Sequence, residues 1–169
     1  MCTTELCATI LLVTTESGST LDRLLCFALH SASRAFTNLY RPFLDEVGLT
    51  YPQYLVMLVL WERESLTVKE LGGLLRLDSG TLSPLLKRLQ TRGLLVRSRS
   101  EADERSVRVE VTDEGRALWQ QARDIPQRMV SATGMDLGEV EQLRSTLENL
   151  TTTLNDAARR VTENRETKR

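Results

Sequence analysis

The sequence predicts a mainly helical fold that carries a small β-hairpin, an α+β arrangement. Three observations support this prediction. Amphipathic spacing recurs along most of the 169 residues, four patterns typical of a helix start lie at separate points, and Ser106–Val111 alternates apolar and polar residues as a half-buried strand does. With 41% hydrophobic and 27% charged residues, the chain has the composition of one globular domain with a sizeable core.

The helix starts are marked by a residue with a side-chain oxygen, followed three positions later by an acid or an amide. Such pairs can bond the amides that the first turn of a helix leaves unpaired. The pairs are Ser19/Asp22, Thr50/Gln53, Thr67/Glu70 and Asp136/Glu139. The helices predicted from them cover 20–46, 51–62, 67–74 and 136–160.

Two further helices are predicted over 79–92 and 113–132, and Pro126 is expected to bend or interrupt the second. Gly48 and Gly93 are expected helix ends, because glycine tolerates the left-handed backbone found there. Leu94–Arg99 can pair with the strand at 106–111 to form the hairpin, across a polar loop.

Charge is unevenly distributed. The whole chain carries −1, but residues 76–108 hold eight Lys or Arg against four acids, so this segment is +4 and the remainder −5. Local charge decides where phosphates dock, so this segment is the expected nucleic-acid surface.

Two short helices followed by a basic hairpin predict a winged helix-turn-helix. Small polar side chains at the start of the second helix can approach base edges, basic residues further along suit phosphates, and an arginine in the hairpin loop suits a minor groove. The expected DNA contacts are Ser79, Thr81, Ser83, Pro84, Lys87, Arg88, Arg92, Arg99, Asp103 and Arg105, with Asp103 holding Arg105. The alternative is a solvated basic face on an ordinary helical domain.

Cys26 is the only cysteine outside the N-terminal 18 residues, which hold Cys2 and Cys7. Arg23 precedes it by three positions, and His30, the only histidine, follows by four. A positive neighbour favours the reactive thiolate, whereas most cysteines are small structural hydrophobes. Both interpretations stay open from the residues alone. Along the predicted helix, a polar stripe holds Cys26, His30, Ser33, Thr37 and Tyr40.

Three stretches resemble the MarR family of dimeric repressors, and within it the OhrR branch that senses organic hydroperoxides. They are LTYPQYLVMLVLWE (49–62), LDSGTLSPLLKRLQTRGLLVRSRS (77–100) and EADERSVRVEVTDEGRAL (101–118). The resemblance implies a two-fold dimer whose first and last helices interlock on a palindromic operator, with half-sites about one helical turn apart. It also implies that Cys26 is the peroxide sensor and that Tyr40 of the partner subunit bonds to it. A nearer tyrosine of the family is replaced by His30.

Together these observations predict four parts of the chain. Residues 1–18 form a flexible arm, 19–50 and 113–160 the dimerisation region, 51–112 the winged helix-turn-helix, and 161–169 a frayed tail. Within one helix Cys26 and Tyr40 are roughly 21 Å apart. They can meet only if two copies of the helix cross antiparallel near Ser33.

The expected function is a cytoplasmic homodimeric repressor that leaves double-stranded DNA when organic hydroperoxides oxidise Cys26. No cysteine lies in the C-terminal half, so a low-molecular-weight thiol is expected to resolve the sulfenic acid, with Cys2 or Cys7 as the other candidates. One alternative is release by a non-covalent phenolic or lipophilic ligand. A thiol peroxidase is less favoured, because the chain has one histidine and neither a phosphate-cradling glycine motif nor a metal cluster. No cofactor, metal or membrane partner is expected.

Overall fold

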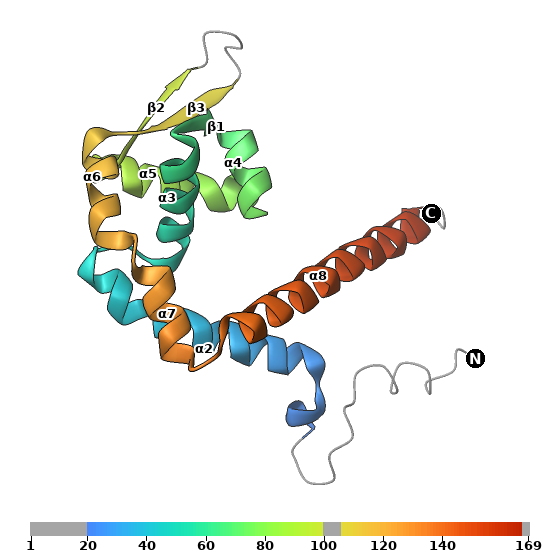
Figure 1. Ribbon diagram of the computed structural model, residues 1–169. Coiled ribbons are helices and arrows are strands. Elements are labelled where there is room, and N and C mark those ends of the chain that lie inside the picture. Colours follow the sequence, from blue (N-terminus) through green and yellow to red (C-terminus); the bar gives the residue numbers. More distant parts are fainter. Residues whose placement is uncertain (1–19, 100–105, 167–169) are drawn as a thin grey trace. The chain divides into compact units, whose positions relative to one another are not determined.

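The computed structural model describes residues 20–99 and 106–166 (Figure 1). The chain divides into two compact units, the first ending at Arg123 and the second starting at Asp124. The first unit contains the 3-10 turn η1 (Leu21–Arg23), α2 (Leu25–Glu46), α3 (Tyr51–Arg63), β1 (Ser65–Thr67), α4 (Val68–Leu75), α5 (Ser79–Thr91), β2 (Leu95–Arg99), β3 (Val107–Val111) and α6 (Asp113–Ala122). The second contains α7 (Ile125–Thr133) and α8 (Leu137–Glu166).

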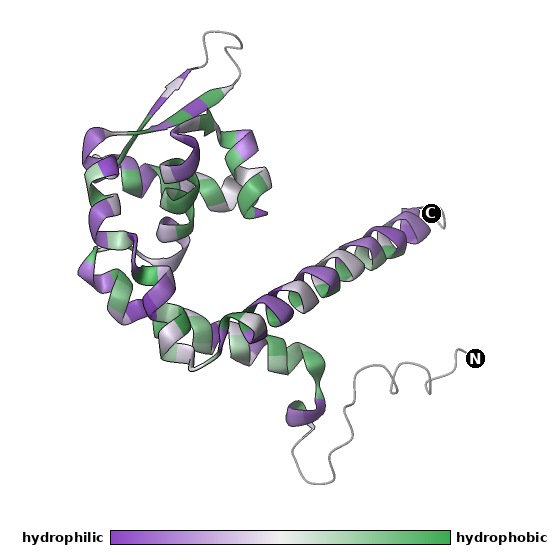
Figure 2. Cartoon of the chain, viewed as in Figure 1, coloured by the Kyte–Doolittle hydropathy of each residue, from purple (hydrophilic) through white to green (hydrophobic). Residues whose placement is uncertain are grey.

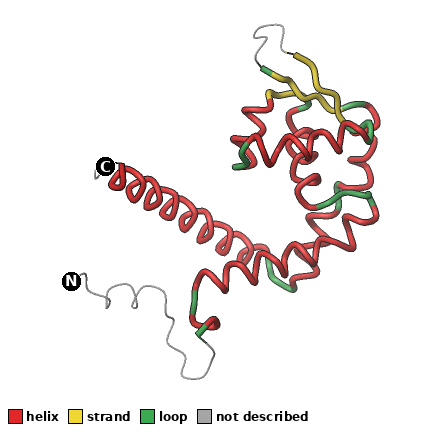
Figure 3. The backbone as a smooth tube through the Cα atoms, turned by 180° about the vertical axis from the view of Figure 1, so that it is seen from behind, coloured by secondary structure: helices red, strands yellow, loops and turns green. Residues whose placement is uncertain are grey.

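This order of elements confirms the predicted fold class, a mainly helical winged helix-turn-helix. The strands, yellow in Figure 3, form an antiparallel sheet in the order β1-β3-β2, in which Val109 pairs with both Leu66 and Arg97. The hairpin of β2 and β3 was predicted, whereas β1 was not. Three residues are too few to show an alternating pattern, and β1 depends on β3, more than 40 positions away.

Three of the four predicted helix starts are confirmed. Glu70 Oε2 accepts from the Thr67 amide at 2.8 Å while Thr67 Oγ1 accepts from the Glu70 amide at 3.2 Å. Asp136 and Glu139 exchange the same two bonds, both at 2.9 Å, and Gln53 Oε1 accepts from the Thr50 amide at 2.9 Å. Each pair satisfies amides that no preceding turn can reach.

The predicted start of the first helix, near residue 20, is wrong. Ser19 lies outside the described residues, and Leu24 has an extended backbone (φ −93°, ψ 121°) that separates η1 from α2. The long helix therefore begins at Leu25. Because the residues on both sides of Leu24 are compatible with a helix, nothing in the local sequence marks this break.

The C-terminal helices agree with the prediction in part. The helix predicted over 113–132 is interrupted near Pro126, as expected: α6 ends at Ala122 and α7 begins at Ile125, with Pro126 in its first turn, where a missing amide costs nothing. The frayed tail predicted from 161 is wrong for 161–166, since α8 continues to Glu166. After Gly138 this stretch contains no glycine or proline that would end a helix.

The core of the first unit lies between α3, α4, α5 and the sheet. Its side chains are apolar and at most 1% exposed: Val56, Met57, Leu60, Leu71, Leu82, Leu86, Leu89, Leu95 and Val109. At Gly115, where α6 passes the start of the wing, a Cβ would lie 2.1 Å from the Leu94 carbonyl oxygen. Only glycine allows that approach. None of the helices in the described ranges has the length and hydropathy that crossing a bilayer requires.

Candidate DNA-binding surface and sensor helix

The second helix of the helix-turn-helix, α5, has one apolar and one polar face. Leu82, Leu86 and Leu89 are buried, which fixes the helix against the core. The polar-face residues predicted to contact DNA are all exposed: Ser79, Thr81, Ser83, Pro84, Lys87 and Arg88. This division places the small side chains of the first turns outward, where a groove could receive them.

Asp78 fixes the start of α5. Its Oδ1 accepts from the Thr81 amide at 2.9 Å and its Oδ2 accepts from the Thr81 hydroxyl at 2.8 Å. The bond from the Thr81 amide, followed by that from its hydroxyl, lowers the pKa of Asp78 below its ordinary value. The ionised carboxylate also matches the positive end of the helix dipole.

A hollow of about 670 Å³ opens between α4, α5 and the wing. Its rim combines the hydroxyls of Ser79 and Ser83 on α5 with three cations: Lys69 on α4, Arg76 at the C-cap of α4, and Arg97 on β2. Gln90 orients Arg97, because its Oε1 accepts a hydrogen bond from the arginine Nε at 2.7 Å. A concave surface with this donor set suits an anionic backbone such as a phosphodiester chain.

The wing residues are described only in part. Arg99 ends β2, is exposed and pairs with Val107. Asp103 and Arg105, the predicted minor-groove pair, lie outside the described residues, and so do Cys2 and Cys7.

Arg92 makes a contact that the sequence did not predict. It was expected to contact phosphate, but its guanidinium donates to the carbonyl oxygens of Gly48 and, at 3.5 Å, Val47, just past the end of α2. The reason is its place at the C-cap of α5, at the opposite end of the helix from the hydroxyl-bearing turns. No pattern in the sequence links position 92 to position 48.

Cys26 and His30 are exposed on α2, one helical turn apart. Within the single chain the Cys26 side chain is therefore not part of a core. Further along the helix, Thr37 donates to the Ser33 carbonyl oxygen at 2.9 Å. The polar stripe exists as predicted, and its two ends, at Cys26 and Tyr40, lie too far apart to touch within one chain.

Arg23 was expected to be a positive neighbour of Cys26 on the same helix. The structure places it in η1, beyond the extended Leu24, so the two residues do not share a helix. The Arg23 Nε is buried and, among the described residues, has no hydrogen-bond partner. The helical spacing that suggested Arg23 as a neighbour of the Cys26 thiol is therefore not present.

Tyr40 belongs to a chain of aromatic rings that joins α2 to α3 and α6. Its ring centroid lies 5.2 Å from Phe36, 4.9 Å from Tyr51 and 6.0 Å from Tyr54. The chain continues from Tyr54 to Trp61 at 6.2 Å and from Trp61 to Trp119 at 5.2 Å. The contacts from Tyr40 to Tyr51 and Tyr54, and from Trp61 to Trp119, join different helices and were not predicted from the sequence.

Burial raises the pKa of Tyr40, and the neighbouring Tyr51 raises it further. The phenol therefore stays protonated at neutral pH and keeps a hydrogen to donate. At the far end of the ring chain, Trp61 Nε1 donates to the Gly115 carbonyl oxygen at 2.7 Å, which holds α6 on α3.

Apolar residues are exposed or only half-buried on two helices. On α2 the exposed ones are Leu25, Phe27 and Phe36. On α8, apolar residues that are exposed or half-buried recur at alternating spacings of three and four: Val140, Leu143, Leu147, Leu150, Leu154, Ala157 and Val161. Figure 2 shows green residues between purple ones along this helix. This 3.5-residue repeat is typical of a helix that packs along another helix.

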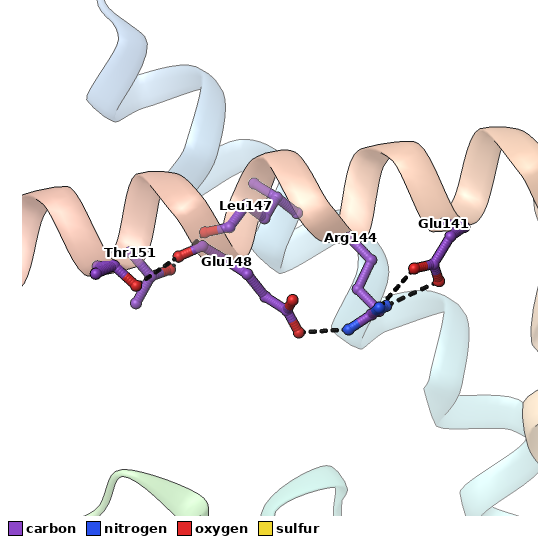
Figure 4. Close-up of polar contacts among 6 residues, drawn as sticks. Glu141, Arg144, Leu147, Glu148 and Thr151 are labelled. Atoms are coloured by element: carbon purple, nitrogen blue, oxygen red, sulfur yellow. Dashed lines mark hydrogen bonds and ion pairs between the residues drawn. The ribbon is translucent and has the colours of Figure 1, made fainter.

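Several polar side chains of α8 bond along their own helix. Arg144 pairs with Glu141 at 2.6 Å and with Glu148 at 2.5 Å, and the Thr151 hydroxyl donates to the Leu147 carbonyl oxygen at 2.7 Å (Figure 4). These pairs hold the polar side chains along their own helix. The apolar row is what α8 offers to a neighbour.

Comparison with known proteins agrees with this arrangement. Residues 38–122 match the family model described as transcriptional regulator SarA/Rot. The chain is 48% identical, over 134 residues, to the organic hydroperoxide resistance transcriptional regulator of Bacillus subtilis, and the match covers 79% of this chain and 91% of that protein.

Solved structures give the same result. Reduced AbfR bound to DNA has a TM-score of 0.66 at 33% identity, and the match covers 77% of this chain and 91% of that one. AbfR is a Staphylococcus epidermidis protein that has also been solved in an overoxidised form on DNA and in a disulfide form. A mutant of Escherichia coli MarR in complex with operator DNA has a TM-score of 0.66 at 25% identity, covering 75% of this chain and 92% of that one. These relatives are transcriptional regulators rather than enzymes. The chain belongs to the MarR family of DNA-binding transcriptional regulators, as a regulator of the OhrR type.

Proposed function

We propose that this regulator is a cytoplasmic homodimeric repressor in which Cys26 senses organic hydroperoxides. The observation that carries the proposal is the exposed Cys26 on α2, one turn from His30, in a chain 48% identical to an organic hydroperoxide resistance regulator. Exposure gives the oxidant access to the sulfur, and an adjacent imidazole can donate a hydrogen bond to a thiolate.

The dimer is proposed from the apolar residues on α2 and α8. Isolated leucines on a surface are common, but the row on α8 keeps its spacing from Val140 to Val161. A second copy is the occupant favoured here, because only a second α2 can bring Tyr40 to Cys26. Two copies also present two α5 helices, which suits a palindromic operator.

The chemistry proceeds in two balanced steps. The Cys26 thiolate attacks the distal oxygen of the hydroperoxide and the O–O bond breaks. The hydroxyl passes to the sulfur, which gives a sulfenic acid, and the leaving alkoxide takes a proton from water to become the alcohol. A low-molecular-weight thiol then condenses with it, forming a mixed disulfide and releasing water. Tyr40 of the partner subunit donates a hydrogen bond to the reacting sulfur, and its raised pKa keeps that hydrogen in place.

DNA binding is proposed to use the exposed α5 residues Ser79, Thr81, Ser83, Pro84, Lys87 and Arg88, together with Arg99 and the wing pair Asp103 and Arg105. The hydroxyls approach base edges and the cations contact phosphates. Modification of Cys26 changes how the two copies pack, and so the spacing of the two α5 helices.

The deciding experiment is a gel shift on operator DNA with reduced protein and with protein treated with cumene hydroperoxide and a small thiol. We expect release of wild type, no release of Cys26→Ser, and a thiol adduct on Cys26 by mass spectrometry. If Cys26→Ser still leaves DNA, a non-covalent ligand response replaces the redox proposal. A Cys26 disulfide with Cys2 or Cys7 as the main product would instead make the N-terminal arm the resolving group.

A further inference from the structure

Arg92 connects the ends of two helices with different roles. It is the C-cap of α5, which presents the proposed DNA contacts, and its guanidinium reaches the end of α2, which carries Cys26. Nη1 donates to the Gly48 carbonyl oxygen, and Nη2 lies 3.5 Å from the Val47 carbonyl oxygen. One side chain thus joins the sensor helix to the recognition helix directly.

Arg92 donates to carbonyl oxygens that the closing hydrogen bonds of α2 do not use. The Leu49 amide donates to the Leu44 carbonyl at 3.0 Å and the Gly48 amide to the Asp45 carbonyl at 3.2 Å, the usual closing bonds of a helix that ends in glycine. The carbonyls of Val47 and Gly48 follow these. A helix end needs partners for such groups, and here α5 supplies one.

The charges favour the same contact. The last turn of α2 contains Asp45 and Glu46 and no basic residue, so its negative dipole end lacks a cation of its own. The Arg92 guanidinium supplies that charge from α5.

Gly48 leaves room for the guanidinium. Its φ of +66° favours glycine, and a Cβ there would lie 3.1 Å from Arg92 Nη2. Gly48, which ends α2, is therefore also the residue that the Arg92 guanidinium contacts.

We propose that Arg92 is a positioning residue that fixes α5 relative to α2 and so transmits the state of the sensor helix to the DNA-binding surface. It acts on DNA affinity through α2 and not by contact with phosphate. The positioning of α5 by Arg92 can be tested in the reduced protein alone. The transmission of Cys26 oxidation to α5 rests on the function proposed above.

The test compares Arg92→Gln with Arg88→Gln, its exposed neighbour on α5 with an expected phosphate contact. Operator affinity is measured across a range of salt concentrations. A lost phosphate contact makes the slope of log affinity against log salt less negative by about 0.9 per contact, and a dimer loses two. We expect Arg88→Gln to change the slope in this way. Arg92→Gln should weaken binding about fivefold with the wild-type slope.

Arg92→Lys, which keeps the charge but not the forked donor, should recover part of the affinity. Gly48→Ala should weaken binding more in the wild-type background than in Arg92→Gln, where the contact is already lost and only the strain of a side chain at a φ of +66° remains. Far-UV circular dichroism checks that each variant is folded. Wild-type affinity in Arg92→Gln, or a slope change equal to that of Arg88→Gln, would overturn the positioning role.

The transmission is tested with the ratio of operator affinity before and after peroxide treatment. We expect this ratio to shrink at least about threefold in Arg92→Gln, because part of the link is already broken. An unchanged ratio would overturn transmission. Failure of the function proposed above has a separate signature: Cys26→Ser would keep its peroxide response, while the salt comparison in reduced protein would be unaffected.

Discussion

The winged helix-turn-helix, from α3 to β3, and the two helices α2 and α8 differ in how their apolar residues are covered. In the first, the core leucines of α3, α4 and α5 contact one another and are at most 1% exposed. In α2 and α8, the apolar rows are exposed or half-buried in the single chain. The comparison teaches that one copy is enough to build the surface that reads DNA, whereas the proposed sensor is complete only with a second copy.

Leu154→Asp should have the largest effect, because it breaks the apolar row of α8 in both copies at once. Leu154 is 54% exposed, so a single copy loses little. If the row is the dimer contact, two lost leucine contacts of about 2 kcal/mol each weaken the dimer about a thousandfold. Analytical ultracentrifugation measures this change. Ser145→Asp, off the apolar row on the same helix, is the control and should stay dimeric; equal behaviour of the two variants would refute the assignment of the row.

Leu86→Ala comes next and acts on the region that a single copy completes. Removing a fully buried leucine side chain should lower the free energy of unfolding by about 3 kcal/mol. Urea denaturation measures this loss, which should be the same at all protein concentrations in a background held monomeric by Leu154→Asp. Leu74→Ala on α4, where the side chain is 49% exposed, should cost far less. Comparable losses would mean that the DNA-binding core is not independent of the partner.

Tyr40→Phe tests the proposed contact between the copies. A hydrogen bond to a charged sulfur contributes about 1.4 kcal/mol, so its loss should slow Cys26 oxidation about tenfold while reduced-state DNA affinity is kept. The rate is followed as loss of DNA binding after peroxide addition. Tyr51→Phe, whose ring contacts Tyr40 within the chain, should oxidise at the wild-type rate. Slowing in both variants would point to the packing of the rings instead of the hydroxyl of Tyr40.

Asp78→Asn should have the smallest effect, confined to the start of α5. The pKa of Asp78 is lowered in the folded chain, so the carboxylate stabilises the fold above its ordinary value of 3.8 and this gain is lost as pH falls through the folded pKa. The difference in stability between wild type and Asp78→Asn should thus be constant from pH 7 to pH 5 and shrink below pH 4. Thermal unfolding at several pH values checks this, and a difference that grew on acidification would contradict it.

The sequence predicts the features that depend on neighbours in the chain. Thr67 and Glu70 bond each other across one turn, and α5 shows its polar face through the spacing of Leu82, Leu86 and Leu89 alone. Both the fold class and the exposed set on α5 follow from such local patterns.

Features that need distant partners were missed. The strand at Ser65–Thr67 exists because β3 pairs with it, and the Arg92 guanidinium donates to the carbonyl oxygen of Gly48, 44 positions earlier. The prediction of where α2 begins was wrong for another reason: the backbone of Leu24 is extended, although the residues around it are compatible with a helix.

Both tryptophans of the chain belong to the ring chain described above, with their centroids 5.2 Å apart in α3 and α6. Indole emission therefore reports on the packing of α3 against α6, and α8 contributes no fluorescence from tryptophan. Circular dichroism, by contrast, weighs the 30 residues of α8 heavily. Melting curves recorded with the two signals coincide only if the long helix and the region that reads DNA unfold as one cooperative body.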